Sequence, residues 1–379
     1  MRIYPYFLGL LGAALLSAAV CTTTVACQAQ PMSEYQADAR FLAGIRTPGG
    51  PLAGLESSPA WIRFAQYFDE SWREFDGKQL APMREWAAQA LAGTASAETP
   101  VFYPFGGPDF VNVHTLFPRG RAYLMVALDP LGEIPDFASM DDRQLEDFYA
   151  NLRRSLQDLV HRDFFVTREM EVTLAPTGVG GVLPVILFFM ARMGDRIMDV
   201  QYWLMRPDGT VEEVPARLRQ PIPQAGVTGL RLVFTSGGSD RPQTLYYLRL
   251  NLDNRSLSDH PRVVSFLEGF TPATTFVKAG SYLMFSRSFR DVARFILDHS
   301  DHVLQTASGI PFRDFEPSVW KIDLFGSYTG PIDLFRGKEQ PDLVEAYKRG
   351  VRVEPLPFGI GYHFRPGTSN LLFASRRRP

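Results

Sequence analysis

The residues from 103 to 121 combine prolines and glycines, which fix an irregular loop, with side chains that could do chemistry. Asp109 and His114 could act together as an acid–base pair. Arg119 and Arg121 follow them and could bind an anionic group. The alternative is a rigid turn in which Asp109 accepts hydrogen bonds from backbone amides. Because functional groups are often presented by loops, this stretch is the first candidate site.

A second stretch, from 305 to 328, is dense in glycine, proline, aromatic and polar residues, as ligand-binding clefts often are. The side chains in it that could contact a ligand are Gln305, Arg313, Asp314, Trp320 and Tyr328. The alternative is a well-ordered loop that crosses the core. Neither stretch has the period of a helix or the alternation of a strand, so both are expected at the ends of elements. We predict that the two stretches face one shared cleft.

Three weaker motifs do not specify a site. His299 and His302 could share a helix face and bind a metal with one more ligand, but histidines near a helix C-terminus are also favoured by the dipole. The glycine-rich 177–181 segment lacks the pattern of a dinucleotide- or phosphate-binding loop and is expected to be a flexible connection. Ser318 and Lys321 have the S-x-x-K spacing of penicillin-binding enzymes without the other two elements that those enzymes need. We therefore expect no metal and no cofactor.

The elements that must position these residues are helices and strands in mixed order. Ser58 and Pro59 are typical of a helix N-terminus, and an aromatic stripe at helical spacing follows, which favours a buried face. The predicted helices are 59–75, 83–91, 141–160, 182–193, 261–270, 289–298 and 338–348. The predicted strands are 122–128, 169–174, 197–204, 211–214, 229–235, 244–251 and 370–374. Because strands and helices do not alternate strictly, we predict an α+β fold with a mixed sheet and helices packed around it.

The first 27 residues have the pattern of a bacterial-type export signal, with Arg2 as the only charge before an apolar run and a small-residue site. The Val-Ala-Cys sequence that ends at Cys27 suits lipoprotein processing, in which Cys27 becomes the lipid-bearing N-terminus. The alternatives are cleavage after Ala26 or Ala29, which releases a soluble protein, and an uncleaved anchor. We predict a signal over 1–27, a tether and loop over 28–55, and one globular domain over 56–379.

Composition narrows the class of protein. Hydrophobic residues make up 45% of the chain and charged residues 21%, which is typical of globular proteins. The formal net charge of −2 provides no overall basic field, so no nucleic-acid partner is expected. Both cysteines, Cys21 and Cys27, lie in the signal, so the mature chain would have no disulfide and no thiol nucleophile.

The Tyr-Pro-Phe-x-Gly-Pro-Asp stretch at 103–109 resembles one found in an uncharacterised family of exported bacterial proteins. The stretches at 128–132, 278–283 and 308–311 are similar to that family as well. The chain departs from the family pattern at Gly106, where a serine is usual, and at 306–307, where polar or acidic residues are usual. The resemblance implies export and a single domain over roughly 60–350, but no activity.

These observations lead to two hypotheses of different classes. The first is a cell-envelope protein, attached to the membrane through a lipid on Cys27, that binds or assembles with an unknown envelope ligand or protein and has no catalysis of its own. The second is a periplasmic hydrolase that uses Asp109 and His114. Whether the chain is an enzyme stays open at this point.

Overall fold

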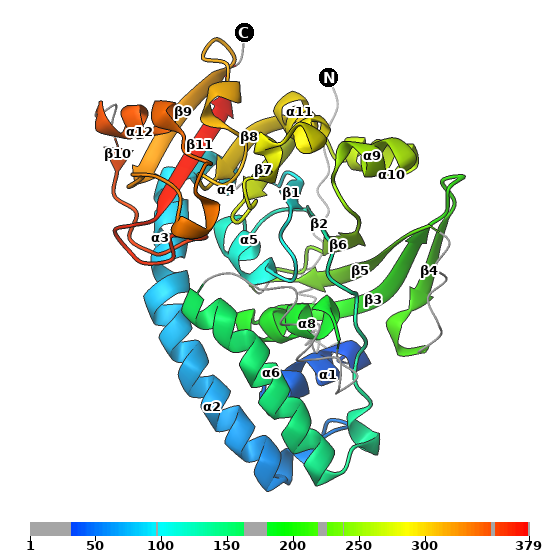
Figure 1. Cartoon of the computed structure of the whole chain (residues 1–379). Coiled ribbons are helices and arrows are strands. Elements are labelled where there is room, and N and C mark those ends of the chain that lie inside the picture. Colours follow the sequence, from blue (N-terminus) through cyan, green and yellow to red (C-terminus); the bar gives the residue numbers. More distant parts are fainter. Residues whose placement is uncertain are drawn as a thin grey trace, which may run out of the picture. The chain divides into compact units, whose positions relative to one another are not determined.

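The computed structural model describes residues 32–95, 98–162, 180–218, 226–237, 239–349 and 353–377. The described residues from Ser33 onward form one folded unit, built on an eleven-stranded mixed sheet with helices packed around it (Figure 1). The predicted α+β class and single large domain are confirmed. The export signal, Cys27 and the predicted strand at 169–174 lie outside the described residues.

The helices agree with the sequence pattern at most positions where one was predicted. They are α1 (Glu34–Leu42), α2 (Pro59–Phe75), α3 (Ala81–Ala90), α4 (Ala92–Ala95), α5 (Phe110–Leu116), α6 (Asp142–Arg162), α8 (Val182–Met193), α9 (Asn254–Asp259), α10 (Pro261–Glu268), α11 (Arg290–His299) and α12 (Pro341–Lys348).

The strands are β1 (Val101–Pro104), β2 (Ala122–Ala127), β3 (Arg196–Met205), β4 (Val211–Pro215), β5 (Val227–Thr235), β6 (Gln243–Arg249), β7 (Ala273–Val277), β8 (Ser300–Gln305), β9 (Trp320–Gly326), β10 (Val353–Glu354) and β11 (Asn370–Arg376). Their order across the sheet is β10-β9-β11-β8-β7-β1-β2-β6-β5-β3-β4.

Helix α2 begins where the sequence predicts. The Ser58 hydroxyl accepts a hydrogen bond from the Trp61 amide at 3.2 Å, and Pro59 occupies the first turn. Members of the aromatic stripe on α2 are buried, among them Trp61, Phe64 and Phe68, so the stripe is a packing face as expected.

Residues 34–42 differ from the predicted tether. They form α1, which is capped by the Ser33 hydroxyl and buries Phe41 and Leu42 completely. The Gln36 side chain also accepts a hydrogen bond from the Ile197 amide on β3 at 2.5 Å. The segment looked like a tether because most of its residues are polar or small. Ala37, Ala39, Phe41 and Leu42 are nevertheless buried, so the folded unit starts well before residue 56.

Within the described sheet, β8, β7, β1, β2 and β6 are neighbours and run parallel to one another. The chain enters this segment in the middle at β1, continues outward through β2 to β6, and then returns to the other side of β1 to form β7 and β8 (Figure 1). The direction of progress across the sheet therefore reverses between β1 and β7. In open sheets of this kind, ligands bind outside the carboxyl ends of the strands at such a reversal.

Both faces of the parallel segment are buried. Along β2, Tyr123 and Met125 belong to one hydrophobic cluster, whereas Leu124 and Val126 belong to another. This alternation is the period-2 geometry of a strand, and it places the two clusters on opposite faces of the sheet. The first cluster includes residues of α1, α2, α6 and α8, and the second includes residues of α10, α11 and α12. The strands are therefore held from both sides, which fixes the loops at their ends.

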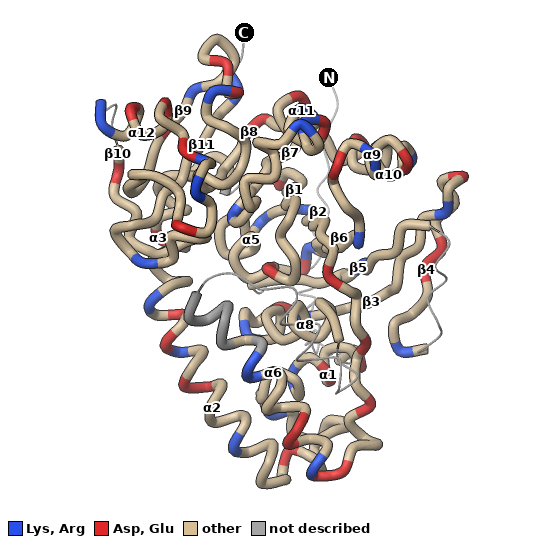
Figure 2. Tube along the Cα trace, viewed as in Figure 1, with Lys and Arg blue, Asp and Glu red and all other residues tan. Residues whose placement is uncertain are grey.

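Charges are distributed in a mixed pattern. Figure 2 shows positive and negative residues interspersed along α2 and α6. The apolar run at 182–191 forms most of α8 and is buried. Among the described residues, no helix is both long and apolar enough to cross a bilayer.

Candidate functional site at the carboxyl ends of the parallel strands

A cavity of about 420 Å³ lies at the point where the strand order reverses. Most of its wall comes from four segments at the ends of β1 (within 103–109), β2 (127–129), β6 (250–252) and β7 (within 278–283), and Phe289 and Tyr362 complete it. We call it the switch-point cavity. Its volume lies in the range of small-molecule sites, and its position is the one that sheet topology favours for a ligand.

The backbone around this cavity is strained. Among the described residues, the non-glycine residues with positive φ are Phe105 at 63°, Ser281 at 49° and Tyr282 at 54°. Phe105 and Ser281 line the switch-point cavity, and Tyr282 follows Ser281 directly. Residues that carry a Cβ rarely adopt a positive φ, and this backbone conformation costs about 1–3 kcal/mol per residue. Strain of this kind gathers at functional sites, so its concentration here supports a functional role for the cavity.

A buried ion pair forms part of the cavity wall. The Lys278 ammonium lies 2.7 Å from the Asp109 carboxylate, and each side chain is only 2% exposed. The Tyr103 hydroxyl donates to the same carboxylate oxygen at 2.7 Å, and the Asn112 amide donates to the other oxygen at 2.9 Å. Charges this deeply buried are tolerated only when they are paired and hydrogen-bonded. Asp109 is thus anchored by side chains from β1, α5 and the loop after β7.

A second polar pair lines the cavity. The Ser281 hydroxyl and the Tyr362 hydroxyl lie 2.6 Å apart. Burial raises the pKa of Tyr362 above its ordinary value of 10.0, while the hydrogen bond to Ser281 acts in the opposite direction. Tyr362 therefore stays a neutral hydroxyl at physiological pH and can both donate and accept hydrogen bonds.

The loop that carries Lys278 and Ser281 is supported from behind by the 305–311 segment. The Thr306 hydroxyl donates to the Lys278 carbonyl at 2.5 Å, and the Gly280 amide donates to the Ser308 hydroxyl at 3.1 Å. A Cβ on Gly280 would lie 2.8 Å from the Ser308 carbonyl oxygen, so a side chain there would push the two loops apart. The Ser-Gly-Ile-Pro stretch thus fixes the site without lining it.

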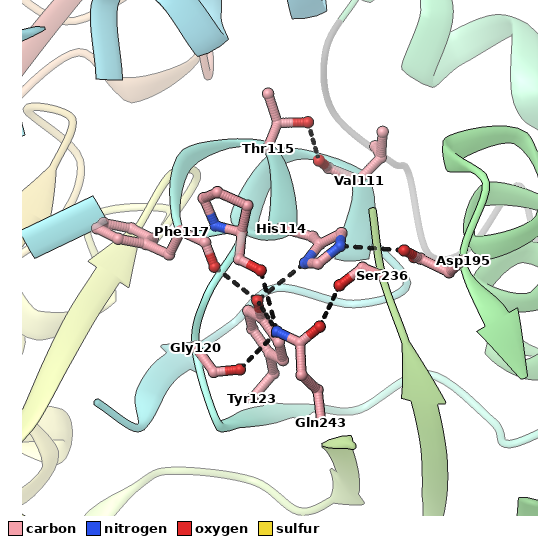
Figure 3. Close-up of polar contacts among 10 residues, drawn as sticks. Val111, His114, Thr115, Phe117, Gly120, Tyr123, Asp195, Ser236 and Gln243 are labelled. Carbon is pink, nitrogen blue, oxygen red and sulfur yellow. Dashed lines mark hydrogen bonds and ion pairs between the residues drawn. The ribbon is translucent and has the colours of Figure 1, made fainter. Parts of the chain in front are cut away.

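The predicted Asp109–His114 pair is not formed. Asp109 lines the switch-point cavity, whereas His114, near the other end of α5, lines a different cavity. Both ring nitrogens of His114 have protein partners, the Tyr123 hydroxyl at 2.8 Å and the Asp195 carboxylate at 3.3 Å (Figure 3). The His114 ring is therefore engaged by Tyr123 and Asp195 and not by Asp109. The alternative is corrected in part: the Asp109 amide closes a turn by donating to the Gly106 carbonyl at 3.1 Å, but the Asp109 side chain makes no capping bond to α5.

Arg119 and Arg121 line the same cavity as His114 and lie away from Asp109. Arg119 lies 3.1 Å from Glu98. The candidate residues of the 103–121 stretch therefore line two different cavities: Asp109 lines one, and His114, Arg119 and Arg121 line the other. The reason is that buried α5 passes between them.

The predicted ligand-binding residues of 305–328 have structural roles. Gln305 is buried, and its side-chain amide bonds to the backbone of Ile310 at 2.7 and 2.8 Å, which closes its own loop. Trp320 is buried beneath the Arg376 guanidinium, 4.7 Å away. The shared cleft is not formed by either of the two large cavities, since 305–328 lines neither.

The remaining candidates of that stretch are accounted for as well. Asp314 is paired with Arg290 at 2.7 Å, and Arg313 is exposed beside it. The Tyr328 side chain is buried, with its ring centroid 6.2 Å from that of Tyr347. These contacts agree with the alternative of a well-ordered loop.

The weaker motifs also have structural explanations. His299 ends α11 and His302 lies on β8, so they do not share a helix face. No group of metal-ligating side chains occurs in the described part of the chain. Lys321 lies on β9 rather than one helical turn from Ser318. Of the 177–181 segment, only Gly180 and Gly181 are described.

The charged residues of the site that the sequence did not offer as candidates are Lys278 and Asp129. Lys278 lies in a stretch singled out only by the family resemblance, and Asp129 lies in another. A lysine directly after a buried strand was the signal for the first, but β7 itself was not predicted.

No family model, curated protein or solved structure matches this chain. The resemblance of 103–109 to an uncharacterised exported family stays a prediction.

Proposed function

We propose that this chain is a cell-envelope binding protein whose ligand is a small molecule held in the switch-point cavity. The observation that carries the proposal is the coincidence of three features at one place. The strand order reverses there, a cavity of about 420 Å³ opens there, and strained non-glycine residues among those described cluster there. Folding alone does not require strain and buried charge at the same edge of the sheet.

The lining groups indicate the chemistry of the ligand. Asp109 and Asp129 contribute two carboxylates and Lys278 one ammonium, so the charged groups sum to a net negative charge. Phe105 and Phe289 provide an apolar wall, with ring centroids 6.2 Å apart. Such a cavity favours a molecule with an apolar part and amine or hydroxyl donors over an anion.

The hydrolase hypothesis is not retained. It needs Asp109 and His114 within reach of one substrate, and these residues line different cavities. A general base must first lie within hydrogen-bond reach of the proton that it removes, whatever its pKa. A binding function without catalysis by this pair therefore fits the arrangement better.

We predict that probes bearing an amine or a hydroxyl bind the full chain saturably. Replacing the Asp129 carboxylate should weaken their binding. The probes are tyramine, glucosamine and glucose, with benzoate as the anionic comparison, and the measurement is isothermal titration calorimetry. Asp129→Asn keeps the shape of the side chain but removes its charge. We expect at least a tenfold loss of affinity, about 1.4 kcal/mol, for the amine that binds best.

Asp333→Asn is the matched control, because it removes the same charge from a side chain that is 91% exposed. It should leave the affinity unchanged. Failure of every amine and hydroxyl probe to bind the wild type, or equal affinity in wild type and Asp129→Asn, would count against the proposed site.

We also propose that Cys27 carries lipid and holds the protein at the membrane. The support is the Val-Ala-Cys site after the apolar run. Multiple acyl chains anchor a protein durably, whereas a single chain does not. We expect the native protein in the membrane fraction, with the mass of an acylated N-terminal Cys27 by intact-mass spectrometry. Cys27→Ser should lose both properties, and an unlipidated wild type that begins at or after Gln28 would contradict the prediction.

A further inference from the structure

The switch-point cavity is charged where it is buried. The lining residues at this inner end are Tyr103, Asp109, Asp129 and Lys278, and none of them is more than 4% exposed. Two carboxylates and one ammonium leave the inner end with a net negative charge. A positively charged group is therefore the one that this end of the cavity favours.

The lining residues that reach solvent mark the open end of the cavity, and the large ones among them are apolar. Leu128 is 58% exposed, and Phe105, Leu283 and Phe289 are half-buried. The Phe105 amide donates to the Val126 carbonyl at 2.8 Å, which holds the loop of Phe105 beside the segment that carries Leu128. We call Phe105, Leu128, Leu283 and Phe289 the apolar rim. Single exposed apolar side chains are common, but several around one cavity mark a binding surface.

The polar side chains at the open end have partners within the protein. They belong to Ser281, Tyr362 and Asn251, which are half-buried and line the cavity. Ser281 and Tyr362 are hydrogen-bonded to each other, and the Asn251 amide donates to the Asp253 carboxylate at 2.6 Å. The surface that the open end leaves uncovered is therefore chiefly apolar.

The backbone at Phe105 indicates that its side chain serves the rim. Phe105 has a φ of 63°, a conformation that glycine adopts without strain. A glycine, Gly106, stands directly after it in the chain. A half-buried phenylalanine gains less from core packing than a fully buried one, so packing alone is a weak reason to keep a side chain at a strained position. A ligand that covers the ring supplies a further reason.

We infer that the ligand of the switch-point cavity is an alkyl amine amphiphile. Its ammonium head enters the buried end, and its alkyl chain leaves across the apolar rim. This inference rests on the proposed function and adds the class and the orientation of the ligand. A compact molecule that stays inside the cavity would leave Leu128 in water, whereas a chain that crosses the rim covers it.

The test is calorimetric titration of the full chain with butylamine, hexylamine and octylamine, each below the concentration at which it forms micelles. A fully buried methylene contributes about 0.8 kcal/mol, which is roughly a fourfold gain in affinity. The open rim covers each methylene on one side only, so octylamine should bind about tenfold or more tighter than butylamine. Octanoate, which has an anionic head on a chain of the same length, should bind more weakly than octylamine.

The variants separate the chain from the head. Leu128→Ser changes an exposed side chain and should weaken octylamine about threefold or more while leaving butylamine unchanged. Phe105→Gly removes a rim side chain and relieves the positive φ, and it should have the same effect. Leu218→Ser is the matched control, because Leu218 is 56% exposed and lines neither of the two large cavities. It should change neither affinity.

The same chemistry could come from a free amphiphile or from a lipid in a bilayer. Sedimentation with phosphatidylcholine vesicles, with and without octadecylamine, distinguishes these sources. Sedimentation that requires octadecylamine, and that Asp129→Asn abolishes and Asp333→Asn keeps, would indicate a bilayer source. Octylamine binding in solution without such sedimentation would indicate a free amphiphile, and either result agrees with the inference.

Three results would overturn the inference and leave the proposed function standing. They are equal affinity for butylamine and octylamine, an undiminished gain with chain length in Leu128→Ser, and octanoate binding as tight as that of octylamine. Failure of all three amines to bind would instead count against the proposed function itself.

Discussion

Replacing Lys278 with methionine is expected to lower the free energy of unfolding by about 3–5 kcal/mol. The substitution leaves the Asp109 carboxylate buried, 2% exposed, without the ammonium that lies 2.7 Å from it. The hydrogen bonds from Tyr103 and Asn112 offset only part of the cost of a buried charge. Urea unfolding of the full chain, followed by tryptophan fluorescence, measures the change.

Lys321→Met is the matched control. Lys321 lies 2.8 Å from Asp323, nearly the same separation, but its side chain is 62% exposed. Exposed pairs of this kind contribute at most about 1 kcal/mol. The comparison therefore isolates the effect of burial, since residue type, substitution and distance are matched.

A second substitution tests the cause of the loss. Adding Asp109→Asn to Lys278→Met removes the stranded charge and keeps a polar side chain for Tyr103 and Asn112. We expect the double variant to be more stable than Lys278→Met alone, because the two changes are coupled through one ion pair. Equal losses for Lys278→Met and Lys321→Met, or a double variant less stable than Lys278→Met, would show that the pair is not a buried charge cluster.

Gly181→Ala is expected to destabilise the protein by about 3 kcal/mol or more, beyond the usual range of point substitutions. A Cβ on Gly181 would lie 2.2 Å from the Gly132 nitrogen and 2.3 Å from the Pro130 carbonyl oxygen. Both are backbone atoms, so no rotamer change can relieve the clash. The first amides of α8 donate to this same segment, Val182 to Pro130 and Leu183 to Leu131, each at 2.9 Å.

These hydrogen bonds explain why the effect should spread. Separating the 130–132 segment from the start of α8 breaks two backbone hydrogen bonds, each worth about 1 kcal/mol. The separation shifts α8, whose residues 182–191 are all buried. It also displaces the loop that carries Asp129. Thermal unfolding measures the change, with Gly93→Ala as the control, since a Cβ on Gly93 meets nothing within 4 Å. An unfolding midpoint for Gly181→Ala equal to that of Gly93→Ala would contradict the close backbone contact.

The same contact bears on the 177–181 motif. The amides at the start of α8 are already bonded to carbonyl oxygens, so they are not available to hold a phosphate. Gly181 is required for close backbone approach rather than for anion binding. At the described end of the motif, the role of the glycine is therefore close packing against the 130–132 segment.

Elements with a local signal were predictable from the sequence by itself. Ser58, Pro59 and the aromatic stripe determine α2, since capping and the 3.6-residue period act within one segment. The β3–β4 hairpin follows from two strand-like runs around the turn at Pro207–Gly209. The predicted mixed sheet and α+β class depended on such segments, and the structure agrees with them.

Strands β1, β7 and β8 were not predicted, although they surround the point where the strand order reverses. All residues of β1 and β7 are buried, so they lack the alternation that marks a half-exposed strand. Parallel strands also pair through long crossovers, and no local feature of Val101–Pro104 indicates that Ala273–Val277 lies beside it.

The site depended most on the tertiary structure. Asp109 was a candidate from its loop, but its partner was expected to be His114, which is near in sequence. The fold instead brings Lys278, which is distant in sequence, to Asp109, and it places Asp195 against His114. Sequence determines which residues can carry charge and where the chain can turn. Which charges meet is decided by the order of the strands, because that order determines which loops share an edge of the sheet.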